Sequence, residues 1–209
     1  MPYNKQVIPK NMKKFIVYVW LIVLLTAISG FFWYNSWIYH LPTPVPAHYH
    51  AVQAGSIIKL NNTLLAYNNK PLFLHFFNPE CPCSRFNMAS FKALYNQYNG
   101  QLNFVVIVMT EKKYTGADIQ QKFGLDIPVM FDGSIATACG VYSTPQAVLI
   151  NTNHTLYYRG NYNKSRYCTD EKTSFAKQAI IGLLTNNTRL KFSRFALTAY
   201  GCRLPNCTK

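Results

Sequence analysis

Acidic residues are scarce in this sequence. Only 7 of its 209 residues are Asp or Glu, against 21 Lys or Arg, and the formal net charge is +14. Such a balance can indicate nucleic-acid binding, but the basic residues after position 40 are scattered, and no zinc-finger, helix-turn-helix or RNA-binding signature is present. We therefore expect a basic, solvated surface that can lie near anionic lipid, and no nucleic-acid partner. Nucleotide-binding motifs are missing as well, so we expect no cofactor.

Charge of either sign is missing from Phe15 to Tyr39. This stretch offers about 20 mostly apolar positions, which is enough for a helix to cross a bilayer. Four lysines precede it and the first charge after it is Lys59, so the positive-inside rule places the N-terminus in the cytoplasm and the rest of the chain outside it. We predict an uncleaved single-pass anchor in the inner (plasma) membrane, with a periplasmic domain. The alternative is a signal peptide cleaved before Gly30, although bulky aromatic residues follow that position at once.

The remainder of the chain changes from proline-rich to strongly apolar. The stretch "HLPTPVPAHYH" predicts a stiff spacer. The continuous runs "LFLHFF" and "LNFVVIVM" then predict buried strands, and strands alternate with helices up to two adjacent strands, "QAVLIN" and "TLYYRG". This order predicts an α/β class with a central mixed β-sheet flanked by helices. The predicted segments are a cytoplasmic N-terminus (1–14), a transmembrane anchor (15–36), a proline-containing spacer (37–55), a folded domain (56–187), and a C-terminal helix with a cysteine-containing tail (188–209).

Cysteine is absent from the predicted anchor and from everything before it. The six cysteines of the chain are Cys81, Cys83, Cys139, Cys168, Cys202 and Cys207. An even number in a domain outside the cytoplasm is typical of disulfide chemistry, but the spacing does not fix the connectivity.

Cys81 stands where the first buried strand gives way to a helix. Unpaired backbone N–H groups and the positive end of the helix dipole stabilise a thiolate at such a position, and Arg85 adds a nearby cation. We therefore infer a nucleophilic sulfur. The alternative is a metal-binding or inert pair of cysteines.

Two motifs resemble the thioredoxin superfamily. The first, "FLHFFNPECPCSRF", is similar to its strand, turn and helix start, and the second, "GVYSTPQAVLI", resembles the segment that carries a cis-proline facing the active cysteine. The resemblance spans roughly residues 71–184. It extends to membrane-anchored thiol–disulfide oxidoreductases, the redoxin branch, and an uncharacterised bacterial thioredoxin-like family with a CPC motif. It implies a thioredoxin fold, with Thr144–Pro145 as a cis bond that orients an extended substrate. The implied activity is thiol–disulfide exchange on protein thiols, with a redox partner protein.

The cysteine pattern departs from the usual Cys-x-x-Cys of that superfamily. Aligned on Cys81, the second cysteine would fall at Ser84, and Cys83 comes one position early. We predict that Cys81 attacks and Cys83 resolves. A Cys-x-Cys bridge closes a small ring with distorted geometry, so it is easily reduced and the pair tends to be oxidising. Cys139 and Cys168 are further candidates, which either pair with each other or resolve Cys81, and Cys139 can equally be a small buried residue. Cys202 and Cys207 are expected to form a structural disulfide.

Two alternative functions stay open. The first is a peroxiredoxin-like peroxidase, which needs a hydroxyl residue three positions before its cysteine. At that distance Asn78 precedes Cys81 and Glu80 precedes Cys83, and neither is Thr or Ser. The peroxidase is therefore less favoured than disulfide exchange. A copper-handling protein without catalysis would use the two thiolates, which suit Cu(I). Its nearest histidine, His75, lies within an apolar strand, where we expect a hydrogen-bonded core residue. We predict no metal site.

Overall fold

The computed structural model describes residues 9–67, 69–164, 171–187 and 190–204. The chain divides into two compact units, Met1–Leu41 and Pro42–Lys209. The first unit holds a single long helix, α1 (Lys10–His40). The most apolar window of 18 residues within its segment Asn11–Asn35 has a mean hydropathy of 2.4, and none of that window is buried. The helix is thus long and apolar enough to cross a membrane, as an N-terminal anchor or a signal sequence would.

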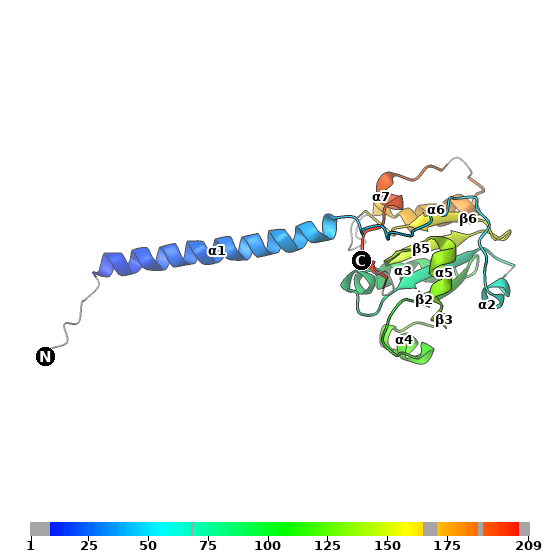
Figure 1. Cartoon of the computed structure of the whole chain (residues 1–209), viewed down its shortest axis with the longest axis horizontal. Coiled ribbons are helices and arrows are strands. Elements are labelled where there is room, and N and C mark those ends of the chain that lie inside the picture. The colour runs from blue at the N-terminus through cyan, green and yellow to red at the C-terminus, as the bar shows by residue number, and fades with distance from the viewer. Residues whose placement is uncertain (1–8, 68, 165–170, 188–189, 205–209) are drawn as a thin grey trace. The chain divides into compact units, whose positions relative to one another are not determined.

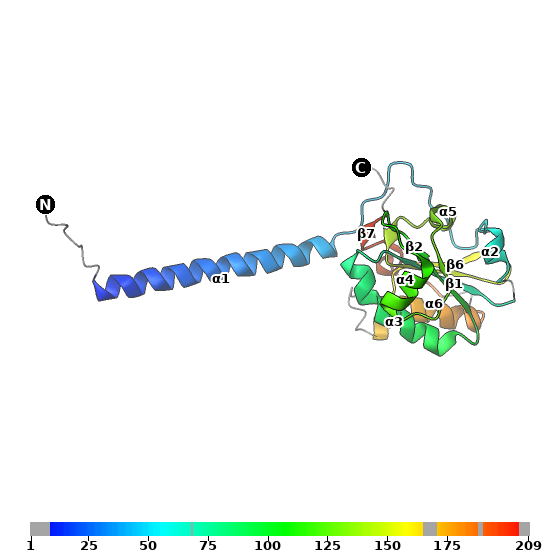
Figure 2. The same cartoon turned by 90° about the horizontal axis from the view of Figure 1, so that it is seen from below.

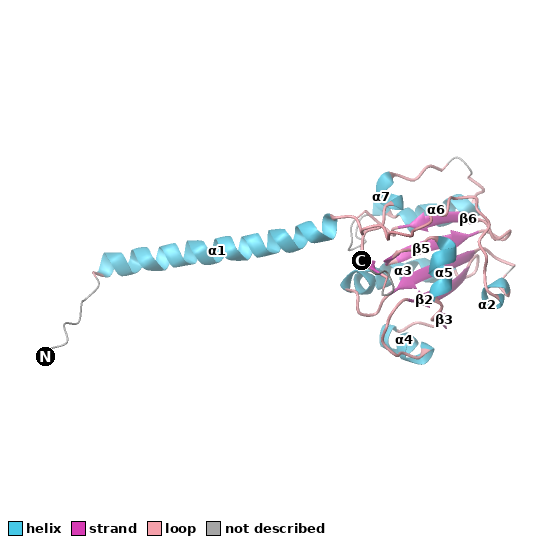
Figure 3. Cartoon of the chain, viewed as in Figure 1, coloured by secondary structure: helices cyan, strands magenta, loops and turns pink. Residues whose placement is uncertain are grey.

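The second unit alternates helices and strands, as Figure 3 shows by colour. Its helices are α2 (Asn62–Leu65), α3 (Pro82–Tyr98), α4 (Gly116–Phe123), α5 (Gly133–Cys139), α6 (Phe175–Leu184) and α7 (Arg194–Leu197), with a 3-10 turn at Glu171–Thr173. Its strands are β1 (Leu72–Phe77), β2 (Asn103–Val108), β3 (Val129–Met130), β4 (Ser143–Thr144), β5 (Gln146–Ile150), β6 (Leu156–Gly160) and β7 (Cys202–Arg203).

A mixed five-stranded sheet forms the centre of this unit, in the order β3-β2-β1-β5-β6. The strands β1, β2 and β3 run parallel, whereas β5 pairs antiparallel with both β1 and β6. A separate two-stranded ladder joins β4 to β7. This topology is that of a thioredoxin-like domain, so the predicted fold class is confirmed.

Helices cover both faces of the sheet, which explains why β1 is apolar at almost every position. All six residues of β1 are buried. Side chains from α3, α4 and α6 build the core cluster on one face, and side chains from α2 and α5 build the cluster on the other. Figures 1 and 2, turned by 90° from each other, show α3 and α6 on the side of the sheet opposite to α5. The carboxyl end of β1, where the chain turns into α3, therefore lies between packed layers.

Part of the predicted spacer belongs to the folded unit. The chain is assigned to this unit from Pro42 onward, and Thr43 is buried with its N–H donating to the Ala199 carbonyl at 2.8 Å. Tyr49 donates a hydrogen bond to the Gly140 carbonyl at 2.9 Å. Hydrogen bonds to the domain therefore hold this part of the segment 37–55 against the folded unit.

The C-terminal segment, for which a helix and a cysteine-containing tail were predicted, contains the four-residue helix α7 and the two-residue strand β7. Ala196 and Ala199 are fully buried. This segment is a structural part of the domain, because its backbone has hydrogen-bond partners in β4, in Asn161 directly after β6, and in Thr43.

Candidate active site

The loop between β1 and α3 holds Cys81 in a defined place. The Cys81 N–H donates to the Asn78 carbonyl at 3.1 Å, and the Asn78 N–H donates to the Ser84 hydroxyl at 3.3 Å. The Glu80 N–H donates to the side-chain oxygen of Asn78 at 2.9 Å. Ser84, the position of the usual second cysteine, thus ties the loop to the first turn of the helix.

Cys81 is the N-cap residue of α3, and Pro82 opens the helix. The cysteine side chain makes no capping hydrogen bond, so the N–H groups of the first turn are available to a charge on its sulfur. Those groups and the helix dipole favour the thiolate over the thiol. Arg85 lies on the same first turn with an exposed side chain, and its influence on the thiolate remains a prediction.

The segment around Pro145 faces this sulfur. The Thr144–Pro145 peptide bond is cis. Cys81 Sγ lies 3.8 Å from the Thr144 carbonyl oxygen, and Thr144 is completely buried. The structure therefore brings together the two motifs that carry the resemblance to thioredoxins, although Cys81 and Thr144 are 63 residues apart in the sequence.

The disulfide of this site joins Cys81 to Cys202, across a sequence separation of 121 and a Cα–Cα distance of 6.2 Å. The predicted Cys202–Cys207 bridge is wrong, because Cys202 is bonded to Cys81; Cys207 itself lies outside the described residues. The predicted Cys81–Cys83 pairing is likewise not the one found. The cause is the ladder between β4 and β7, in which Thr144 pairs with Cys202, so that the tail cysteine reaches the helix N-terminus.

Cys83 completes a group of three sulfurs. The Sγ atoms of Cys81, Cys83 and Cys202 all lie within 4.8 Å of one another. Cys81 is only 3% exposed and Cys83 only 6%. Sequence reasoning gave Cys202 a structural disulfide and missed its pairing with Cys81, because β7 is two residues long and has no period. The stretch "AYGCRL" offers no local signal for this pairing.

Of the other three cysteines, Cys139 is the one that lies among the described residues, and it does not join this group. Cys139 ends α5 in the core cluster on the opposite face, where it is fully buried and has no disulfide. Burial raises the pKa of its thiol to about 12, although the charge of Arg159 acts in the opposite direction. Cys139 is therefore the small buried residue that sequence analysis left open. Cys168 lies outside the described residues.

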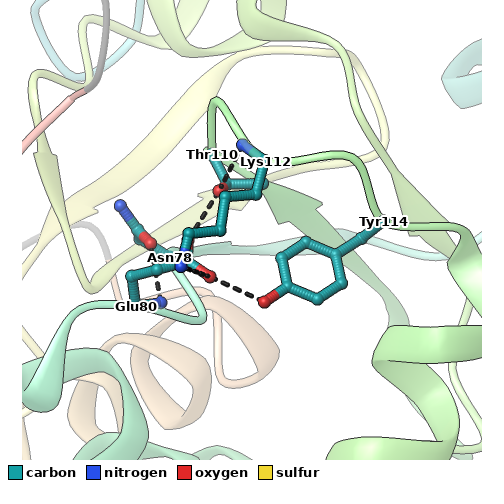
Figure 4. A network of polar contacts seen from close by, with 5 residues as sticks. All are labelled: Asn78, Glu80, Thr110, Lys112 and Tyr114. Atoms are coloured by element: carbon teal, nitrogen blue, oxygen red, sulfur yellow. Dashed lines mark hydrogen bonds and ion pairs between the residues drawn. The ribbon is translucent and has the colours of Figure 1, made fainter.

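A polar network beside Cys81 was not predicted. Glu80 accepts hydrogen bonds from the Thr110 hydroxyl at 2.6 Å and from the Tyr114 hydroxyl at 2.8 Å, and Lys112 Nζ lies 3.9 Å from its carboxylate. Figure 4 shows these groups converging on Glu80 from the loop after β2. Partial burial raises the pKa of the Glu80 carboxyl, but the hydrogen bonds from Thr110 and Tyr114 and the nearby lysines outweigh it and hold the pKa below its ordinary value. The network fastens the residue before Cys81 to the neighbouring loop.

His75 is a core residue, as predicted. It is fully buried in β1, stacks on Phe91 with ring centroids 4.2 Å apart, and shares a 2.8 Å hydrogen bond through Nδ1 with the Tyr162 hydroxyl. Burial lowers its pKa from 6.5 to about 3. Among the described residues, the sulfur group at Cys81 includes no histidine.

Comparison with known proteins places the chain among uncharacterised relatives. A family model described as "Domain of unknown function (DUF6436)" matches residues 50–206, whereas no curated protein sequence matches the chain. A hypothetical protein from Sinorhizobium meliloti 1021 has a similar structure, with a TM-score of 0.60 at 16% identity over 75% of this chain and 96% of that one. An uncharacterized conserved protein from Geobacillus kaustophilus gives a TM-score of 0.59 at 18% identity over 78% and 97%.

A third, weaker similarity is to the thioredoxin domain of a thiol-disulfide oxidoreductase from Bacteroides vulgatus, with a TM-score of 0.46 at 12% identity over 58% of this chain and 98% of that one. The first two similarities show a shared fold. The thioredoxin-like assignment itself rests on the sheet topology described above.

Proposed function

The chain belongs to the family described as a domain of unknown function (DUF6436), and for this member we propose a thiol–disulfide oxidoreductase that acts on protein thiols through Cys81. One observation carries the proposal. Cys81 caps the N-terminus of α3, faces the carbonyl before cis-Pro145, and forms a disulfide with a second cysteine of the same chain. A sulfur placed in this way is both a stabilised thiolate and a good leaving group.

The proposed reaction has two exchange steps. In the first, the Cys81 thiolate attacks one sulfur of a substrate disulfide; the S–S bond of the substrate breaks, and its other sulfur leaves as a thiolate that takes up a proton. In the second, the Cys202 thiolate attacks Cys81 Sγ, the Cys81–Cys202 bond forms, and the first substrate sulfur leaves as a thiolate. The substrate gains two electrons and the chain loses two. A dithiol partner protein restores the chain by the reverse steps, and the same steps run backwards oxidise a substrate dithiol.

Cys202 thus takes the resolving role that sequence analysis gave to Cys83. The bond between Cys81 and Cys202 supports this assignment. Cys83 lies within the same 4.8 Å group and serves as a second exchange partner, because a thiolate at that distance reaches either sulfur of the bond after a small movement.

The proposed location is outside the cytoplasm, with α1 as an uncleaved anchor in the inner membrane. An apolar helix of 25 residues near the N-terminus supports the anchor, and the lysines that precede it support the orientation. Disulfides persist in such compartments, whereas cytosolic thiols are kept reduced.

Redox titration of single cysteine variants tests the proposal. The full chain in detergent micelles is equilibrated with glutathione couples of varied ratio, and its bonds are mapped by mass spectrometry. We expect Cys81–Cys202 to form and break at one defined potential, Cys81→Ser to abolish exchange, and Cys202→Ser to accumulate a Cys81–glutathione mixed disulfide. The proposal fails if Cys81→Ser exchanges as fast as the wild type.

Two other outcomes would favour an alternative. Accumulation of the mixed disulfide in Cys83→Ser, and not in Cys202→Ser, would return the resolving role to Cys83. Turnover of hydroperoxide with a donor thiol would favour the peroxidase alternative.

A second candidate function, binding of a soft metal ion, is favoured by the group of three sulfurs. The three sulfur atoms of this site lie within 4.8 Å of one another while Cys81 and Cys202 are bonded. Reduction of the bond supplies up to three thiolates from these residues, and such donors suit Cu(I). Competition for Cu(I) between the reduced full chain and a coloured chelator measures this binding. We expect Cys83→Ser to weaken Cu(I) retention without abolishing glutathione exchange, and equal retention by Cys81→Ser would exclude this site.

A further inference from the structure

The strand that carries Cys202 occupies the edge beside the reactive sulfur. β7 runs antiparallel to β4, with Thr144 opposite Cys202 and Ser143 opposite Arg203. β4 leads directly into cis-Pro145. An exposed strand edge presents unpaired N–H and C=O groups that bind another extended segment by strand addition. In the oxidised chain, the tail of the protein fills this place.

Up to Ala199, the tail is anchored by hydrogen bonds that do not depend on the disulfide. The Asn161 side-chain amide donates to the carbonyls of Phe195 and Thr198 at 2.7 and 2.6 Å, and the Thr43 N–H donates to the Ala199 carbonyl at 2.8 Å. Beyond Ala199 the described chain is held by the short ladder to β4, by Thr43, by burial of Leu204 and by the disulfide. Reduction therefore removes the only covalent contact of residues 200–204 with the site.

At position 201, directly before Cys202, the structure has room only for glycine. A Cβ built on Gly201 would overlap the Thr144 carbonyl oxygen and lie 3.0 Å from Ser143 Oγ. The Thr43 hydroxyl donates to the Gly201 carbonyl and accepts from the Gly201 N–H, both at 3.0 Å, and it lies 3.1 Å from Ser143 Oγ. The Thr43 hydroxyl thus binds both backbone polar groups of Gly201, and Ser143 Oγ lies beside that hydroxyl.

The position two residues after the cysteine is apolar. Leu204 is only 8% exposed and belongs to the core cluster that covers the α5 face of the sheet. It also borders an open cavity of about 440 Å³ that Met109, Val141 and Tyr142 help to line. An apolar side chain at position 204 is therefore buried next to unfilled space. Arg203, which lies between Cys202 and Leu204, is exposed.

We propose that Gly201–Leu204 is an internal copy of the substrate, and that the reduced enzyme binds partner segments of the pattern glycine–cysteine–any residue–apolar residue. This inference rests on the proposed exchange at Cys81. A dithiol reductant opens the Cys81–Cys202 bond and the tail leaves β4. The partner segment pairs with Ser143 and Thr144, which brings its disulfide-bonded cysteine to the Cys81 thiolate. After the exchange, Cys202 attacks Cys81, the tail pairs with β4 again, and the product is displaced.

Peptides activated as thionitrobenzoate mixed disulfides test this specificity. The full-chain Cys202→Ser variant in micelles is reacted with Tyr-Gly-Cys-Arg-Leu-Pro, and release of thionitrobenzoate is followed together with the mass of the adduct. The same peptide with Ala in place of Gly, or with Ser in place of Leu, serves as the comparison, and the Cys81→Ser/Cys202→Ser variant subtracts reactions at the other cysteines. We expect the Ala peptide to react at least about tenfold more slowly than the glycine peptide, because its methyl group must be forced against the backbone of Thr144. The Ser peptide should also react more slowly than the glycine peptide, because it lacks the apolar side chain.

The outcomes separate the two proposals. If all three peptides label Cys81 at equal rates, exchange at Cys81 stands and the substrate pattern is overturned. If no peptide and no oxidised glutathione labels Cys81, the proposed function itself fails. A second variant, Gly201→Ala combined with Cys202→Ser, weakens the docking of the tail, so it should react faster than Cys202→Ser alone with the glycine peptide; an unchanged or slower rate contradicts competition between tail and substrate.

Discussion

At the scale of single residues, the groups around each sulfur distinguish the cysteines of this domain. Cys81 is the N-cap residue of α3, whereas the Cys139 thiol lies in the apolar core and has a pKa raised to about 12 by burial. Both residues are almost fully buried. Backbone N–H groups at the start of α3 stabilise a negative charge on Cys81, whereas at Cys139 the charge of Arg159 offsets only part of the effect of burial.

His75 makes the folded domain sensitive to acid. Its pKa is about 3 in the fold and 6.5 ordinarily, because burial disfavours the imidazolium. Between these values the unfolded chain binds a proton that the folded chain does not, so the free energy of unfolding falls as the pH drops from 6.5 towards 3, by up to about 1.4 kcal/mol per pH unit. Denaturant titrations of the full chain at pH 7, 5.5 and 4.5 measure this slope. We expect it to flatten in His75→Leu and to persist in the control His50→Gln, which changes an exposed histidine; equal slopes in all three proteins would contradict the assignment.

At the scale of secondary structure, the elements with a repeating pattern were predictable, whereas the two short strands beside Cys81 were not. β1 and β2 are continuous apolar runs, and α3 repeats apolar residues at helical spacing, so the sequence alone indicates both their type and their order. β4 and β7 have two residues each, and no period exists in two residues. Since β7 carries Cys202, the partner of Cys81 was the part of the site that local patterns could not indicate.

The close contact between β6 and α7 offers a test of how the tail is anchored. A Cβ at Gly160 would overlap the carbonyl oxygen of Ala196 and lie 2.6 Å from the Tyr158 hydroxyl. We expect Gly160→Ala to lower the free energy of unfolding by about 1–3 kcal/mol, because the added methyl group has no room. The matched control is Gly100→Ala, where a Cβ meets no atom within 4 Å. Chemical denaturation of both variants measures the difference, and equal stabilities would show that α7 yields without cost.

At the scale of the whole molecule, the disulfide links the N-terminus of α3 to the C-terminal segment of the folded domain. It closes a loop with a sequence separation of 121, and cross-links of this span stabilise a fold chiefly by restricting the unfolded chain. The same bond therefore serves both the proposed chemistry and the stability of the domain.

The cost of opening that bond can be measured. We expect Cys202→Ser to lower the free energy of unfolding by about 4–5 kcal/mol relative to the oxidised wild type, and reduced wild type to resemble the variant. Cys83→Ala retains the disulfide, so it should keep most of its stability and still respond to reductant. Denaturant midpoints with and without dithiothreitol provide the comparison. A Cys202→Ser variant as stable as the oxidised wild type would show that the loop contributes nothing.

The sequence separation of the disulfide also determines how long Cys81 stays without its partner during synthesis. Ribosomes add about 5–20 residues per second, and Cys202 follows Cys81 by 121 residues. Each nascent chain therefore carries Cys81 without Cys202 for on the order of ten seconds, and during that interval Cys81 can form a mixed disulfide with another molecule. Its maturation therefore depends on a folding environment that either protects Cys81 or releases what it has captured.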